Sequence, residues 1–398
     1  MLKMTSHTLA AALLVGLTAT PALAQEVVVK MKVDTKVIQD TVQDVVRDIR
    51  DSVRSTLGPD IRQELRHAAR EIAEAFGDLG NFTWDADTWG QGQSQRFRAT
   101  QTDRETRRFN IGATGQLDLE TLSGDVTVRR GSGRELVVEI IRESRGATDA
   151  AARTGLAEVK AVSEERGGRV TIKTVYPNQR RGTQQHSVSV SYVVSAPAGT
   201  RISTHSLSGD VSIEGIDGEL SVNTMSGDVV ITDAARLTSA KTLSGDLTLT
   251  NVAAEGLLEA STMSGEIVAA GVKARRVDLG AVAGGVSARN VQAEEVKLGS
   301  MSDDVVFEGS LTPRGRYEFT SHSGDVSITL VGQTGFSFDA STFSGSVRSD
   351  VALQGSRTAA RGVGSRRSDT RSLNGTFGDG SAVIEARSFS GSVVVTRK

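Results

Sequence analysis

The sequence predicts a mainly β protein, a β-solenoid or β-helix of two-strand repeats about 19 residues long, with an N-terminal α-helical hairpin in front of it. Three observations lead to this expectation: a short turn motif at nearly constant spacing, alternation of aliphatic and polar residues around it, and the composition. Of the 398 residues 42 are Gly, and 38% are hydrophobic whereas only 4% are aromatic. A core with so few aromatic residues must consist of Val, Ile, Leu and small residues, which suits thin, repetitive β-structure.

The repeat is marked by the motif Ser/Thr, apolar, Ser, Gly, Asp. Eight successive markers between residues 209 and 345 are separated by 18, 18, 20, 19, 19, 21 and 21 residues. Such regularity indicates stacked units of one kind. The copies lie at 121–125, 206–210, 224–228, 242–246 and 262–266, then in weaker form at 281–285 and 300–304, and again at 321–325, 342–346 and 388–392.

Each unit contains two short alternating runs, for example 211–213 and 220–222, so one period holds two strands and two turns. A unit of this size cannot bury its own apolar face, whereas units stacked about 4.8 Å apart bury a continuous ribbon of aliphatic side chains. The alternation excludes helical solenoids, and the leucine-rich repeat pattern is absent. A β-sandwich with a recurring hairpin motif is the competing architecture.

The motif assigns a role to its glycine, since tight turns need positive φ, which glycine adopts at little cost. The predicted turn glycines are Gly124, Gly209, Gly227, Gly245, Gly265, Gly324, Gly345 and Gly391.

Two columns of side chains follow from the stacking. The motif's acidic residue forms a carboxylate column, which we expect to cap turns by accepting backbone N–H bonds, with calcium binding at Asp210, Asp228, Asp246 and Glu266 as the alternative. The motif's second position forms an apolar column, which we expect in the core, with an exposed binding stripe as the alternative. Its members are Leu122, Leu207, Met225, Leu243, Met263, Val282, Met301, His322, Phe343 and Phe389.

The N-terminal quarter of the chain differs from the rest. Residues 1–24 read as a signal peptide, with Lys3, an apolar stretch and an Ala-Leu-Ala cleavage site at 22–24, so we expect export to the periplasm or cell surface. No later apolar run reaches the roughly 18–20 residues that span a membrane. Residues 25–80 form an amphipathic helical segment whose apolar stripes predict a homo-oligomer through these helices, with docking of the stripes on the solenoid or on a membrane surface as the alternatives. Residues 81–107 form a polar linker.

The remaining chain divides into 108–205, a first β-repeat with an α/β insertion, and 206–398, the solenoid proper. Within the insertion we expect strands at 136–141 and 170–175, a helix at 149–165 near Thr148, and an alternating run at 188–194. The helix is placed to cover the open end of the stack. At the other end the array is expected to stop at 393–395.

The sequence also narrows the classes of function. With no Cys, the chain has no disulfides, no thiol chemistry and no Cys-type metal site, and a net charge of −2 gives no global attraction to nucleic acid. No nucleotide-binding, hydrolase or metalloprotease motif occurs, so we assign no catalytic residue and no cofactor, and we expect a non-enzymatic interaction module whose partner is a protein or an envelope-surface ligand. The alternatives are an envelope-stress sensor and a polysaccharide-active β-helix enzyme. The local candidate for the enzyme is the Arg-rich stretch 357–371, although Gly355, Gly362 and Gly364 favour a flexible, solvated loop there.

The segment Ala196-Pro197-Ala198-Gly199-Thr200, the Ser-Gly-Asp series and the closing residues 378–393 resemble a bacterial β-strand-repeat family labelled "putative adhesin". The resemblance covers about residues 108–398 and leaves out the helical segment. It implies an exported envelope protein with a stacked β-structure, some relatives being connected with envelope-stress sensing, and it supplies no catalytic residues.

Overall fold

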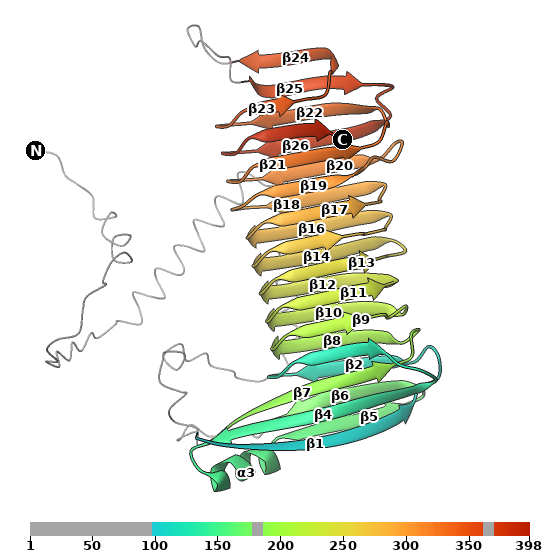
Figure 1. The fold of residues 1–398 in the computed structure, drawn as a ribbon, viewed down its shortest axis with the longest axis vertical. Helices are drawn as coiled ribbons and strands as arrows, with labels where there is room; N and C mark the ends of the chain where they lie inside the picture. Colours follow the sequence, from blue (N-terminus) through green and yellow to red (C-terminus); the bar gives the residue numbers. More distant parts are fainter. Residues whose placement is uncertain (1–97, 177–185, 361–369) are drawn as a thin grey trace, which may run out of the picture. The chain divides into compact units, whose positions relative to one another are not determined.

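The computed structural model describes residues 98–176, 186–360 and 370–398, which form β-strands and one α-helix (Figure 1). Contacts divide the chain into two units, residues 1–78 and 79–398, and everything described here belongs to the second. The expected signal peptide at 1–24, the expected helical hairpin within 25–80 and residues 81–97 of the expected linker lie outside the described residues. Within the described ranges, no helix is long and apolar enough to cross a membrane.

The strands form two sheets, one of 13 and one of 14 strands. Sheet A runs in the order β1 (Ala99–Asn110), β4 (Glu135–Gly146), β7 (His186–Ala196), β3 (Val126–Arg130), β9 (Val211–Glu214), β11 (Val229–Ala234), β13 (Leu247–Val252), β15 (Ile267–Ala270), β17 (Val286–Val291), β19 (Val305–Ser310), β21 (Val326–Val331), β27 (Val393–Arg397) and β23 (Val347–Ser349). Sheet B runs in the order β24 (Gln354–Ala360), β25 (Thr370–Phe377), β22 (Phe336–Thr342), β26 (Ala382–Ser388), β20 (Arg316–Ser321), β18 (Glu295–Ser300), β16 (Arg276–Ala283), β14 (Leu257–Ser264), β12 (Arg236–Ser244), β10 (Glu219–Ser226), β8 (Arg201–Ser208), β2 (Gln116–Thr121), β6 (Arg169–Val175) and β5 (Lys160–Arg166).

Each repeat contributes one strand to each sheet, and we call such a pair a rung. Corresponding strands of neighbouring rungs pair in parallel and in register, as Val229 of β11 does with Val211 on one side and Leu247 on the other. This pairing confirms the solenoid and excludes the β-sandwich, in which the recurring hairpins would pair antiparallel. The inward positions of both sheets form one continuous core, mostly aliphatic but with buried aromatic residues such as Phe307, Tyr317 and Phe319. Burying each Val, Ile or Leu stabilises the fold by roughly 1.5–3 kcal/mol.

The turn glycines connect a strand of sheet B to a strand of sheet A, and five of the eight have positive φ: Gly124, Gly209, Gly227, Gly245 and Gly265. For Gly324, Gly345 and Gly391 the expectation of positive φ is wrong. Their N–H groups instead donate to the hydroxyl three residues earlier, at 2.8–3.0 Å. All eight share a different constraint, because an added Cβ would lie 2.0–2.4 Å from the backbone of the adjacent rung.

The N-terminal end corrects two boundaries. Residues 99–107, expected in the linker, belong to β1, which pairs antiparallel with β4 along its whole length and alternates between half-buried and exposed residues. The helix α3 (Asp149–Glu158) has Thr148 as its N-cap, as expected near its start, but it ends before 165. The residues that follow form β5, which pairs antiparallel with β6 and gains a full strand's hydrogen bonds.

The C-terminal end overturns the expectation that the array stops at 393–395. Strands β26 and β27 lie between the rung of β20 and β21 and the rung of β22 and β23 (Figure 1, where dark red β26 is flanked by orange strands). The last position of sheet B belongs to the antiparallel pair β25 and β24. Arg357 and Arg371, expected in a solvated loop, lie in these two strands, while 361–369 lie outside the described residues.

Substitutions at four glycines measure separately the cost of positive φ and the cost of a close contact with backbone. Gly245→Ala meets positive φ and a carbonyl oxygen at 2.1 Å, Gly332→Ala meets positive φ in open space, Gly324→Ala meets only a close contact, and Gly256→Ala meets neither. We expect Gly245→Ala to lower the free energy of unfolding by roughly 1–3 kcal/mol, with Gly332→Ala and Gly324→Ala in between and Gly256→Ala near wild type. Urea unfolding midpoints give the order, and equal midpoints for Gly245→Ala and Gly256→Ala would contradict it.

Candidate functional site

The apolar column is the most unusual surface of the described residues, because the structure places it outside the core. None of its ten members is fully buried, and Met263, Phe389 and Phe343 are 51%, 41% and 60% exposed. The expectation of a core column is therefore wrong. The reason is the alternation along a strand: the residue before each member, which is a Ser or Thr except at Ala281, points inward as Thr262 does, so the next residue points outward. We call this column the apolar ladder.

The apolar ladder follows ten consecutive strands of sheet B from β2 to β22. At its C-terminal end three rings stack face to face, with ring centroids 4.8 Å apart between His322 and Phe389 and again between Phe389 and Phe343. The interplanar angles are 6° and 5°. The order along the stack is therefore His322, Phe389, Phe343, which only the insertion of β26 between β20 and β22 makes possible.

The inward-pointing hydroxyl groups hold the ladder in place. Thr262 Oγ1 donates to the Gly245 carbonyl oxygen at 3.1 Å, and Ser388 Oγ donates to the Gly324 carbonyl oxygen at 3.0 Å. Each of these hydroxyls lies in the core beside a turn and bonds to the adjacent rung. The backbone that carries the ladder is thus fixed by buried polar contacts, which supports a preorganised surface.

The carboxylate column directly follows the turn glycines, and its side chains accept hydrogen bonds from backbone N–H groups. Asp210 Oδ1 accepts the N–H of Asp228 at 2.9 Å, Asp228 Oδ1 accepts that of Asp246 at 2.9 Å, and Asp246 Oδ1 accepts that of Glu266 at 2.8 Å. Three of the four calcium candidates therefore cap the turn of the next rung. In the described part of the chain, no group of three or more His, Cys, Asp or Glu side chains is arranged to hold a metal ion.

Charge distinguishes the two sides of the apolar ladder. On the outer face of sheet B opposite charges pair between neighbouring strands, as in Lys241 with Glu259 at 3.0 Å and Arg201 with Glu219 at 3.2 Å. Across the described ranges, by contrast, Asp210, Asp228 and Asp246 form no ion pair. The ladder thus runs between a charge-balanced face and an acidic edge.

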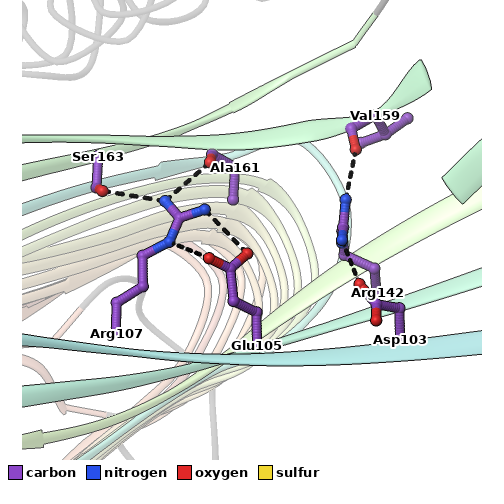
Figure 2. Close-up of polar contacts among 7 residues, drawn as sticks. All are labelled: Asp103, Glu105, Arg107, Arg142, Val159, Ala161 and Ser163. Carbon is purple, nitrogen blue, oxygen red and sulfur yellow. Dashed lines mark hydrogen bonds and ion pairs between the residues drawn. The ribbon is translucent and has the colours of Figure 1, made fainter. Parts of the chain in front are cut away.

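A second polar cluster lies at the N-terminal end, where Figure 2 shows Arg107 joining sheet A to strand β5 of sheet B. Arg107 of β1 donates to the Glu105 carboxylate at 2.7 and 2.9 Å, and it also donates to Ala161 O at 2.9 Å and Ser163 Oγ at 3.0 Å in β5. The hydrogen bonds from Arg107 lower the pKa of Glu105. Arg142 of β4 likewise bonds to Asp103 and to the carbonyl oxygen of Val159, which directly follows α3. This cluster closes the stack and offers no open site.

One shallow hollow groups ionisable residues at the C-terminal end of sheet B. Asp339 and Glu385 lie side by side on β22 and β26, Asn374 lies opposite Asp339, and Arg357 lies opposite Asn374 on the end strands. Sequence reasoning missed this row, because its members are far apart in the sequence and meet only through the order of the end strands.

The family described as Toastrack DUF4097 matches residues 114–396 of this chain. Among solved structures, a "putative lipid binding protein" from Parabacteroides distasonis ATCC 8503 is 13% identical, with 74% of this chain and 97% of that chain covered and a TM-score of 0.39. A "putative adhesin" from the same strain is 11% identical, with the same coverage and a TM-score of 0.34. A "putative adhesin" from Bacteroides fragilis NCTC 9343 is also 11% identical, again with 74% and 97% covered, and has a TM-score of 0.32. No curated protein matches the chain.

The capping role of the carboxylate column has a direct test. We expect Asp228→Ala to cost about 1 kcal/mol of stability, because the Asp246 N–H loses its acceptor, whereas Asp228→Asn keeps an acceptor oxygen and stays near wild type. Thermal melting with and without calcium measures both. A calcium-dependent rise in the melting midpoint that Asp228→Asn abolishes would favour the calcium alternative instead.

The pKa of Glu105 sets a second expectation. Because its folded pKa is lowered, the stabilisation is complete above the unfolded pKa of about 4.3 and is lost as the pH falls through the folded value. Glu105→Gln should therefore lower the urea midpoint at pH 7, with a smaller difference at pH 3. The matched control is Glu165→Gln on β5, an exposed carboxylate that forms no ion pair within the described residues. An equal loss at both pH values would contradict the assignment.

Proposed function

This chain belongs to the Toastrack DUF4097 family, and we propose that it is an exported, non-enzymatic interaction module that binds its partner through the apolar ladder. The observation that supports this most is that no member of the ladder is buried and that Met263, Phe343 and Phe389 are among the exposed large apolar residues of the described chain. Soluble proteins rarely expose long contiguous apolar surfaces, and those that do usually cover them with a partner.

The dimensions of the ladder suit an elongated contact. Ten strands spaced about 4.8 Å apart make a stripe about 43 Å long. Removing apolar surface from water contributes roughly 25 cal/mol per Å², and the rigid backbone beneath the stripe loses little entropy on binding. Large apolar and aromatic side chains on a preorganised edge are the usual anchors of a protein interface.

Export to the periplasm or the cell surface is part of the proposal. It rests on the signal peptide expected at residues 1–24 and agrees with a chain that has no Cys to protect from oxidation. The partner then belongs to the envelope, either a protein or a ligand on the envelope surface. Self-association through residues 25–80 stays a separate prediction from the sequence.

Two alternatives stay attached to particular features. A regulatory envelope-stress sensor would use the amphipathic segment 25–80 to exchange partners. A polysaccharide-active enzyme would work in the hollow that holds Asp339, Glu385 and Arg357, since these are the grouped ionisable residues that such a reaction requires. The hollow is confined to the end strands, whereas the ladder follows the length of sheet B, so we place the ladder first.

The proposal is tested by replacing Met225, Met263 and Phe343 with Ser and measuring binding of the mature chain to isolated envelopes of its own cell. We expect the affinity for the envelopes to fall at least about tenfold relative to the unsubstituted chain, because hot-spot anchors each contribute more than about 1 kcal/mol. The control replaces Val230 and Val331 with Ser; these are 39% and 44% exposed on the outer face of sheet A. Equal losses in both variants, or none in the ladder variant, would refute the ladder as the binding surface.

A further inference from the structure

The last residues of the chain do not form the last rung of the solenoid. We call β26 and β27 the C-terminal rung. It pairs in parallel with β20 and β21 on one side and with β22 and β23 on the other. Val383 thus lies between Arg316 and Ser337 in sheet B. The chain passes this position, builds a further rung and an end hairpin, and then returns to fill the place it left.

The two neighbours of the C-terminal rung make matching contacts with it. Ser388 Oγ donates to the Gly324 carbonyl oxygen at 3.0 Å, and Thr342 Oγ1 donates in the same way to the Gly391 carbonyl oxygen at 2.7 Å. At both junctions the acceptor is therefore the carbonyl oxygen of a turn glycine, and the donor is a Ser or Thr hydroxyl of the rung stacked on it.

The ring contacts repeat in the same way. Phe389 stacks on His322 and Phe343 stacks on Phe389, both with centroids 4.8 Å apart. If the C-terminal rung leaves, the rung of β22 and β23 carries the groups needed to stack directly on β20 and β21 without a change of register. With its C-terminal rung released, the chain loses the burial of that rung and keeps the burial of the other rungs.

We propose that the C-terminal rung is exchangeable and that the slot between its neighbours accepts the C-terminal rung of a second copy of this chain. In such a reciprocal pair each inserted rung makes the same contacts as in the monomer, so the exchange costs little besides association entropy.

The connection into the C-terminal rung is suited to act as the hinge. It consists of four residues between β25 and β26, in which Gly378 and Gly380 have φ of +62° and +66°. Gly380 N–H donates to the Phe377 carbonyl oxygen at 3.3 Å, so the turn is tight. Short, tight hinge loops favour exchange between copies, because the open form releases the turn.

The slot selects for its own sequence, which is why the occupant is a second copy. A Cβ at Gly391 would lie 2.0 Å from the Gly324 carbonyl oxygen, so the inserted turn needs glycine there. Ala382, Val393 and Val395 are fully buried between the sheets, so the insert also needs small or branched apolar residues at fixed spacing. The C-terminal rung of this chain meets each requirement.

Engineered disulfides test the exchange, since the chain has no native Cys. Ser344 and Ser390 are exposed and lie on adjacent rungs, where Ser344 N donates to the Phe389 carbonyl oxygen at 2.9 Å, and neighbouring strands suit disulfide geometry. Full-length Ser344→Cys and Ser390→Cys chains are unfolded, mixed, refolded at high concentration and oxidised. The control mixes Ser344→Cys with Ser264→Cys, an exposed serine of the same column on the distant strand β14.

We expect the mixed disulfide between positions 344 and 390 to exceed that between 344 and 264 at least about tenfold, because exchange raises the effective concentration to the millimolar range. Equal yields overturn the proposal. A Ser344→Cys/Ser390→Cys chain, oxidised as a dilute monomer, has its own rung locked in place. On refolding at high concentration it should form no more dimer than wild type kept folded, as measured by sedimentation. If the locked chain dimerises as much as the refolded wild type, the association lies elsewhere, and the proposal is wrong.

Discussion

The close approach of neighbouring rungs at the Ser-Gly-Asp turn is the constraint on which the rest of the structure depends. At every turn glycine an added Cβ would lie within 2.4 Å of backbone atoms of the adjacent rung. Because the turns touch there, the strands on both sides stay in register and the buried hydroxyls reach the carbonyl oxygens of the neighbouring turn. Positive φ is secondary, since three of these glycines do without it.

The same constraint determines which side chains face solvent. The first motif position points into the core, where hydroxyls such as that of Thr262 bond to the adjacent turn, so the residue after it points outward whatever its polarity. Apolar residues at that position are therefore not required by the core. Their presence on nine of ten consecutive strands, with His322 on the other, is what makes the ladder a candidate for function rather than for stability.

The ends of a solenoid need separate solutions, because the terminal rungs expose unpaired strand edges. At the N-terminal end the long, highly charged β1 and the strand β5 form the edges, and Arg107 joins them across the gap between the sheets. At the C-terminal end the antiparallel pair of β24 and β25 closes sheet B only, and the returning C-terminal rung is held between two others. The N-terminal end is thus closed by the hydrogen bonds of Arg107, and the C-terminal end by the order in which the last strands are stacked.

The sequence by itself determined the repeat, its two strands per unit, the turn residues and the family, because these follow from local periodicity and from residue types with few conformational choices. It also predicted that Asp210, Asp228 and Asp246 could accept backbone N–H bonds, since that needs only a short carboxylate beside a turn. It did not determine where α3 ends or that residues 99–107 form a strand, because those depend on partners distant in sequence. Only the tertiary structure decided that the motif's second position faces solvent and that residues 382–397 lie between two earlier rungs. Alternation defines two faces without saying which is buried, and a shared motif does not say in which order the rungs stack.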